Sequence, residues 1–152
     1  MLLRELFESV QFDNWVKPSE NVLEREYHIE YELKHLGDRM GDPFPTVDHF
    51  LEACDDADIV SLSPRDDSLV GNRSRTRSKE ELLSLIRGYR SYPEFRNEGT
   101  VEALYDGFRQ GKPMELPIVF ERNGKRRIFS GNTRLDVAFQ MGITPKVMIV
   151  RF

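Results

Sequence analysis

Four consecutive residues, Gly131 to Arg134, have the types and spacing of a phosphate-binding loop. They follow a β-rich run and open an amphipathic one, so we expect them at the N-terminus of a helix, where free N–H groups and the helix dipole attract anions. Gly131 permits a backbone geometry that a side chain would obstruct, and Asn132 or Thr133 can cap the helix. Arg134 adds a fixed charge with several donors for phosphate oxygens. Together with the preceding Ser130, this loop is a candidate phosphate site.

A purely structural interpretation of the same loop stays open. Asn and Thr are common helix caps, and Gly is a common turn residue. Arg134 could lie on the surface and pair with Asp136 or with an acid elsewhere in the chain. The loop lacks the lysine and glycine spacing of a P-loop, which excludes that mechanism.

Two short basic stretches could contribute further phosphate contacts. In "NRSRTRS", Arg73, Arg75 and Arg77 alternate, so an extended loop would place all three on one side, against phosphates or a nucleic-acid backbone. The same pattern is also typical of a solvated basic loop that binds nothing. The second stretch, "RNGKRR", contains Lys125 and Arg126. A net charge of −4 disfavours nucleic-acid binding over the whole surface, but such local patches can still bind phosphate.

Phosphoryl chemistry also needs a base or a metal-binding acid. Among acids in predicted loops we select Asp67 and Glu98, although solvated loop acids are common. Magnesium would enter through nucleotide oxygens and one or two such carboxylates. His28, Glu32 and His35 share a helix face, but no third-ligand motif follows them, so no metal site made by the protein alone is predicted.

The elements that position these residues fall into two parts. Residues 1–56 are predicted to be a helical N-terminal extension, with helices over 2–10 and 19–36 and a short one after Thr46, a plausible N-cap. In the second helix the spacing puts Val22, Ile29 and Leu33 on one face, with Glu26 as the only polar member. Trp15, Phe44 and Phe50 are expected to anchor the extension, and Cys54 to be a small core side chain.

Residues 57–152 are predicted to be an α/β unit. A strand over 58–63 precedes a long polar loop over 64–78, and helices follow over 79–89 and 101–111. Asn123-Gly124 predicts a hairpin with a type I′ turn. A helix after Arg134 and a strand over 146–152 complete an α+β fold with a small mixed sheet and packed helices.

The order of these elements from about Asp58 to Phe152 resembles the ParB/sulfiredoxin-like superfamily. The resemblance rests on the Arg-rich loop, the "KEELLSLIRGY" helix, the "LPIVFE" strand, the hairpin and a G-x-x-R sequence that opens a helix. It implies a ParB-like fold in which Gly131 to Arg134 hold nucleotide phosphates, with the arginine loop near the same site. With this resemblance, Arg75 and Arg77 are the first choices for a ligand role in that loop.

Differences from the family motifs indicate which branch of the superfamily this chain resembles most. Sulfiredoxin-like enzymes carry a cysteine in the glycine–arginine motif, where this chain has Asn132 and Thr133, so peroxiredoxin repair is not expected. Partition proteins similar to ParB continue into a helix-turn-helix, whereas this chain stops at Phe152, so a sequence-specific DNA clamp is not expected either. The motif is most similar to the Asp-Gly-His-Thr-Arg loop of the free-serine-kinase branch, with Ser130 in place of the acid and Asn132 in place of the histidine.

The predicted function is therefore nucleotide binding at Gly131 to Arg134, with ATP, ADP or another nucleotide as ligand. Mg-dependent phosphoryl transfer, as in a kinase, or nucleotide hydrolysis would follow. One alternative is a nucleic-acid-binding or nuclease protein, as described for plasmid and phage proteins of this fold, using the cations Arg73, Arg75, Arg77, Lys125 and Arg126. Another is an inert interaction or inhibitor module of phage or plasmid origin.

The expected compartment is the cytoplasm. The apolar runs are too short for a membrane span, which needs about 20 residues, so no membrane partner is predicted. The single cysteine agrees with a reducing environment.

Overall fold

The computed structural model describes residues 11–33, 43–63 and 98–152, and it describes only the backbone over 31–33 and 98–100. Its centre is a four-stranded mixed sheet in the order β2-β6-β4-β5. β6 (Lys146–Arg151) runs antiparallel to β2 (Asp58–Ser61) and parallel to β4 (Ile118–Arg122). β5 (Lys125–Ser130) pairs antiparallel with β4. The predicted α+β class with a small mixed sheet is confirmed.

The turn between β4 and β5 is the predicted two-residue hairpin. Asn123 has φ 52° and Gly124 φ 76°, so both central residues are left-handed, as a type I′ turn requires. The register pairs Arg122 with Lys125 directly across the turn. The turn is therefore tight and fixes which side chains share each face of the hairpin.

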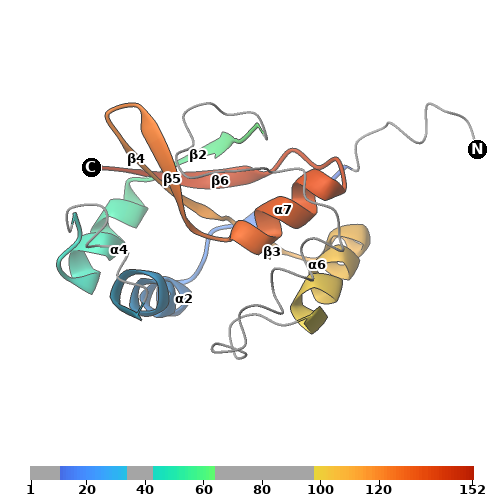
Figure 1. The fold of residues 1–152 in the computed structure, drawn as a ribbon, viewed down its shortest axis with the longest axis horizontal. Helices are drawn as coiled ribbons and strands as arrows, with labels where there is room; N and C mark the ends of the chain where they lie inside the picture. Colours follow the sequence, from blue (N-terminus) through green and yellow to red (C-terminus); the bar gives the residue numbers. More distant parts are fainter. Residues whose placement is uncertain (1–10, 34–42, 64–97) are drawn as a thin grey trace, which may run out of the picture.

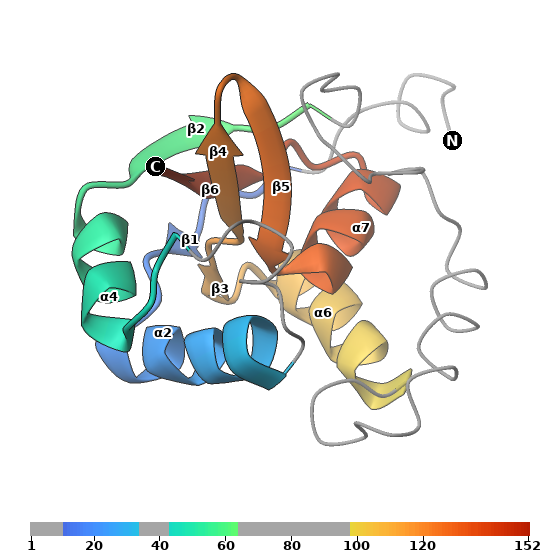
Figure 2. The same cartoon turned by 60° about the vertical axis from the view of Figure 1, so that its left-hand side comes forward.

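Two helical segments from the N-terminal part cover one face of the sheet (Figures 1 and 2). α2 (Glu20–Glu26) begins after Ser19 and α4 (Val47–Asp55) after Thr46, and both cap side chains accept a backbone N–H, as predicted for Thr46. After α2 the chain continues as a π-helix, η1 (Tyr27–Leu33), where the apolar spacing predicted a continuing α-helix. Apolar spacing predicts which face of a helix is buried, but it does not distinguish the hydrogen-bond pattern of a π-helix from that of an α-helix.

A second, two-stranded sheet was not predicted. β1 (Trp15–Val16) pairs in parallel with β3 (Met114–Glu115), through bonds such as that from the Met114 N–H to the Asn14 carbonyl at 2.9 Å. This pairing ties the N-terminal segment to the chain that leads into β4. It also fixes the position of Glu115, which lies beside Arg134.

The core on the α2 and α4 side is rich in aromatic rings. Phe50 from α4 lies 5.1 Å from Phe129 and Phe44 lies 5.2 Å from Phe120, measured between ring centroids, and Phe120 stacks on Phe129 at 4.5 Å. The anchoring role predicted for Phe44 and Phe50 is confirmed. Cys54 is fully buried in the same cluster, also as predicted.

The remaining helices pack on the other side of the molecule. α7 (Asn132–Gln140) places Leu135 against Val119 and Ile149 on the opposite face of the sheet. α6 (Glu98–Gln110) packs on α7, and its Phe108 meets Trp15, whose predicted anchoring role is thereby confirmed. None of the described helices is long and apolar enough to cross a membrane.

Candidate functional site at the N-terminus of helix α7

Gly131 joins the end of β5 to the start of α7. It is the N-cap, with φ 94° and ψ 21°, and its carbonyl accepts the first helical hydrogen bond from the Leu135 N–H at 3.0 Å. A Cβ on this residue would lie 2.7 Å from the Pro117 Cβ and 2.9 Å from its Cα. The local fold therefore requires glycine for its backbone angles and for its close contact with Pro117.

The predicted capping role of Asn132 and Thr133 is wrong. Both residues lie inside the first turn of α7, and the N-cap makes no side-chain hydrogen bond because glycine has no side chain. The first turn also contains no acidic residue. The start of α7 thus lacks a side-chain cap and has no acid in its own first turn, two properties that favour an anion.

The Arg134 side chain is largely buried beside Gly131 at this helix start and does not extend into solvent. Its side chain is only 20% exposed, and Nη1 lies 3.6 Å from the Glu115 Oε2. Its Nε is buried with no hydrogen-bond partner among the described residues. Burial lowers the pKa of the guanidinium, and the charges of Glu115 and Glu26 oppose this shift. Of the partners considered for Arg134, the structure selects Glu115 on β3 and not Asp136.

Glu26 is a site residue that we did not predict. The buried Ser130 hydroxyl donates to its Oε2 at 2.8 Å, so the last residue of β5 is joined to the last turn of α2. The two residues are 104 positions apart in sequence, and no local pattern pairs them. One signal was present, because Glu26 is the only polar member of an otherwise apolar helix face.

The structure leaves most of the other predicted site residues untested. Asp67, Arg73, Arg75 and Arg77 lie outside the described residues. Glu98 was predicted to lie in a loop, but it is the first residue of α6, and its side chain is not described. Their roles in catalysis or phosphate binding stay predictions.

Lys125 and Arg126 lie on the hairpin, at the opposite end of β5 from Ser130. Arg126 donates through Nε to the Glu121 Oε2 at 2.8 Å, and Arg151 donates to the other oxygen of that carboxylate at 2.9 Å. These bonds, that of Arg126 first, lower the pKa of Glu121. Arg126 is therefore neutralised within the fold, whereas Lys125 is exposed with no ion pair to any described residue.

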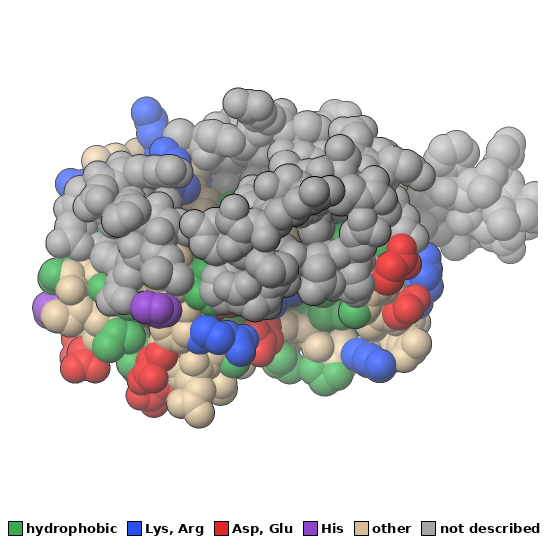
Figure 3. Space-filling view, turned by 60° about the horizontal axis from the view of Figure 1, so that its bottom comes forward, with side chains coloured by type: hydrophobic (Ala, Val, Ile, Leu, Met, Phe, Trp, Pro, Cys, Tyr) green, Lys and Arg blue, Asp and Glu red, His purple; other side chains and the backbone are tan. Residues whose placement is uncertain are grey.

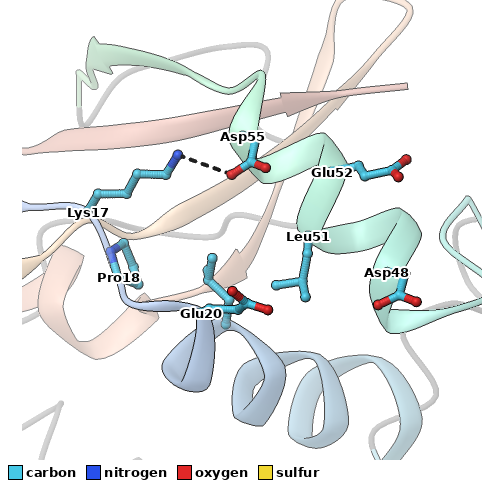
Figure 4. Close-up of a pocket in the computed structure, with 8 residues that line it drawn as sticks. Lys17, Pro18, Glu20, Asp48, Leu51, Glu52 and Asp55 are labelled. Carbon is cyan, nitrogen blue, oxygen red and sulfur yellow. Dashed lines mark ion pairs between the residues drawn. The ribbon is translucent and has the colours of Figure 1, made fainter.

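The remaining candidate groups do not resemble a phosphate site. A groove of about 350 Å³ between α2 and α4 is lined by four acids, a proline, two leucines and Lys17, whose Nζ lies 3.9 Å from the Asp55 Oδ1 (Figure 4). Burial raises the pKa of the Cys54 thiol to about 12, so it stays protonated at neutral pH and is a poor nucleophile. Among the described residues, no group of three or more His, Cys, Asp or Glu could hold a metal ion.

We compared the chain with known protein families, curated proteins and solved structures. No protein-family model, no curated protein and no solved structure matches this chain. The resemblance to the ParB/sulfiredoxin-like superfamily therefore stays a prediction based on element order and the G-x-x-R motif.

Proposed function

We propose that this protein binds the phosphate groups of a nucleotide, such as ATP or ADP, at the N-terminus of α7. The observation that carries the proposal is the buried guanidinium of Arg134, whose Nε has no hydrogen-bond partner among the described residues. A buried donor without a partner costs about 1–3 kcal/mol. Phosphate oxygens would satisfy it while also meeting the N–H groups of the first turn of α7.

The ion pair with Glu115 leaves room for such a ligand. Its N···O distance of 3.6 Å is longer than a charge-assisted hydrogen bond, which is about 2.7–2.9 Å. Glu115 is also more exposed than Arg134, so its carboxylate can turn toward solvent when an anion arrives. The pair thus stabilises the cation in the free protein without occupying its donors fully.

We further propose that Glu26 is the carboxylate that acts at this site. Its Oε2 already accepts a hydrogen bond from the Ser130 hydroxyl at 2.8 Å, so it is placed to orient a hydroxyl or a water beside the phosphates. A Mg²⁺ ion would arrive with the nucleotide, because no group of three or more His, Cys, Asp or Glu among the described residues could hold it alone. Glu26 would then be one protein ligand or the base in phosphoryl transfer or hydrolysis.

Isothermal titration with a panel of nucleotides, with and without Mg²⁺, tests the binding step. Arg134→Ala should weaken binding about tenfold or more, since hydrogen bonds to charged groups contribute about 1.5–3 kcal/mol. The matched control is Arg109→Ala, which removes another ion-paired arginine, bonded to Asp106 on α6. If no nucleotide binds, the proposal fails and an inert interaction module becomes the better reading.

Turnover is a separate measurement. Phosphate release should be lost in Glu26→Gln while nucleotide affinity stays within a few-fold of the original protein. If Glu26→Gln turns over as fast as the original protein, the assignment of Glu26 is wrong. If the original protein binds nucleotide without releasing or transferring phosphate, the site is a binding site only.

A further inference from the structure

The β4–β5 hairpin carries three cations on one face beside its turn. Arg122 lies opposite Lys125, and Arg127 lies opposite Phe120. Residues that oppose each other in an antiparallel pair share a face, and so do residues two apart along a strand. The three cations therefore lie on the same face of the hairpin as Phe120, from the position opposite Phe120 to the turn: Arg122, Lys125 and Arg127. The side chains of Arg122 and Lys125 are exposed.

The other face of the same hairpin is neutralised. There Glu121 lies opposite Arg126 and also binds Arg151, which in turn pairs with Asp58. On the cationic face, Arg122 lies 5.6 Å from the centroid of the Phe152 ring, a contact that orients the guanidinium and keeps its charge. In the part of the chain that the structure describes, neither Lys125 nor Arg127 meets a carboxylate.

This arrangement is unfavourable for the isolated fold. Like charges directly opposite each other in a sheet are destabilising, and an acid at position 125 would convert the Arg122–Lys125 repulsion into an ion pair. The opposite face, with Glu121 across from Arg126, has such a pair at the same turn. The cationic face thus has no carboxylate among the described residues to neutralise its charges, whereas the other face has Glu121. This difference favours an anionic partner for the cationic face.

We propose that this face of the hairpin binds the phosphodiester backbone of a nucleic acid. Two arginines suit phosphate oxygens because their planar forks can donate two bonds, and cations at cross-strand and diagonal spacing can meet successive phosphates. A two-stranded ribbon also fits the DNA major groove, and the turn projects beyond the neighbouring strands in Figures 1 and 2. By contrast, the described part of the face formed by α2 and α6 mixes acidic and basic side chains (Figure 3).

This surface is separate from the site at α7. The two lie at opposite ends of β5, and Arg134 is not among the three cations. The surface also differs from the patch predicted from sequence, because Arg126 lies on the neutralised face and Arg122 and Arg127 take its place.

The test is fluorescence anisotropy with labelled single-stranded and duplex DNA and RNA of arbitrary sequence, at several salt concentrations. The variant Arg122→Gln/Lys125→Gln/Arg127→Gln should weaken binding about tenfold or more and reduce the salt slope by about 2–3, since each lost phosphate contact removes about 0.7–0.9 from it. Comparing the affinities for duplex and single-stranded nucleic acid shows which form this face prefers.

The matched control is Arg25→Gln/Arg109→Gln/Lys146→Gln, which changes the net charge equally at exposed positions elsewhere. It should bind as the original protein does. A second variant, Lys125→Glu, should weaken binding without lowering the midpoint of thermal unfolding, which separates lost binding from lost folding.

Three results would overturn the proposal: no binding at low salt, equal loss in the hairpin and control variants, or unchanged binding in the hairpin variant. A competition experiment with unlabelled polyanions determines whether the face recognises nucleic acid specifically. If polyglutamate displaces the nucleic acid as well as unlabelled nucleic acid does, the face recognises negative charge in general and the assignment to phosphodiester is wrong.

Discussion

At the scale of single residues, Gly131 has a structural requirement that is independent of any ligand. Its left-handed backbone disfavours a side chain, and its contact with Pro117 leaves no space for one. Gly124 shares only the first property, because a Cβ there would meet nothing within 4 Å. The two glycines therefore separate the cost of backbone strain from the cost of a steric clash.

Gly124→Ala should destabilise the protein by about 1–2 kcal/mol, the cost of placing an L-residue in the left-handed region. Gly131→Ala should cost the same strain plus about 1–3 kcal/mol for the clash with the backbone and ring of Pro117. Urea unfolding of both variants measures the difference. Equal losses in the two variants would mean that the chain relaxes around Pro117 at no cost.

Glu115 forms an ion pair with Arg134 and would compete with the phosphates of the proposed ligand for its guanidinium. Removing its charge in Glu115→Gln should raise nucleotide affinity several-fold, because the guanidinium loses its ion-pair partner and keeps only the weaker influence of Glu26. Glu121→Gln is the matched control, since Glu121 also pairs with arginines but lies on the hairpin. Calorimetric titration decides: weaker binding in Glu115→Gln would show that Glu115 helps to orient Arg134 and does not compete with the ligand.

At the scale of secondary-structure elements, the sequence predicted what depends on neighbours in the chain. The Asn123-Gly124 turn and the Thr46 cap follow from backbone preferences and local hydrogen bonds. The pairing of β1 with β3 and the approach of Glu26 to Ser130 could not be predicted, because residues far apart in sequence make them. The helix start at Gly131 was predicted, but its charged surroundings were not.

The cap of α4 gives a prediction at this scale. Thr46 accepts the His49 N–H at 3.3 Å, and α4 delivers Phe50 and Cys54 to the core. Thr46→Ala should lower the free energy of unfolding by about 1 kcal/mol, the usual effect of losing an N-cap side chain. Thr46→Ser keeps the hydroxyl and should stay close to the original stability in the same denaturant titration. If serine is as destabilising as alanine, the threonine methyl group matters more than the cap.

At the scale of the whole molecule, residues 11–33 and 43–56 share their cores with the C-terminal part of the chain. Phe50 touches Phe129 and Phe120, while Trp15 packs on Phe108 at 5.6 Å. The candidate site also spans both parts, because Glu26 reaches Ser130. Folding of the site therefore requires the N-terminal part to be docked.

This arrangement predicts one cooperative unfolding transition. Trp15 is the only tryptophan, so its fluorescence reports docking of the N-terminal part, while far-UV circular dichroism reports the secondary structure of the whole chain. In urea the two midpoints should coincide. Phe50→Ala should shift both together, by about 3–5 kcal/mol in the free energy of unfolding, because Phe50 is fully buried between the two parts. A fluorescence transition that precedes the dichroism transition would show instead that the N-terminal part undocks by itself, and the contact between Glu26 and Ser130 would then be lost before the sheet unfolds.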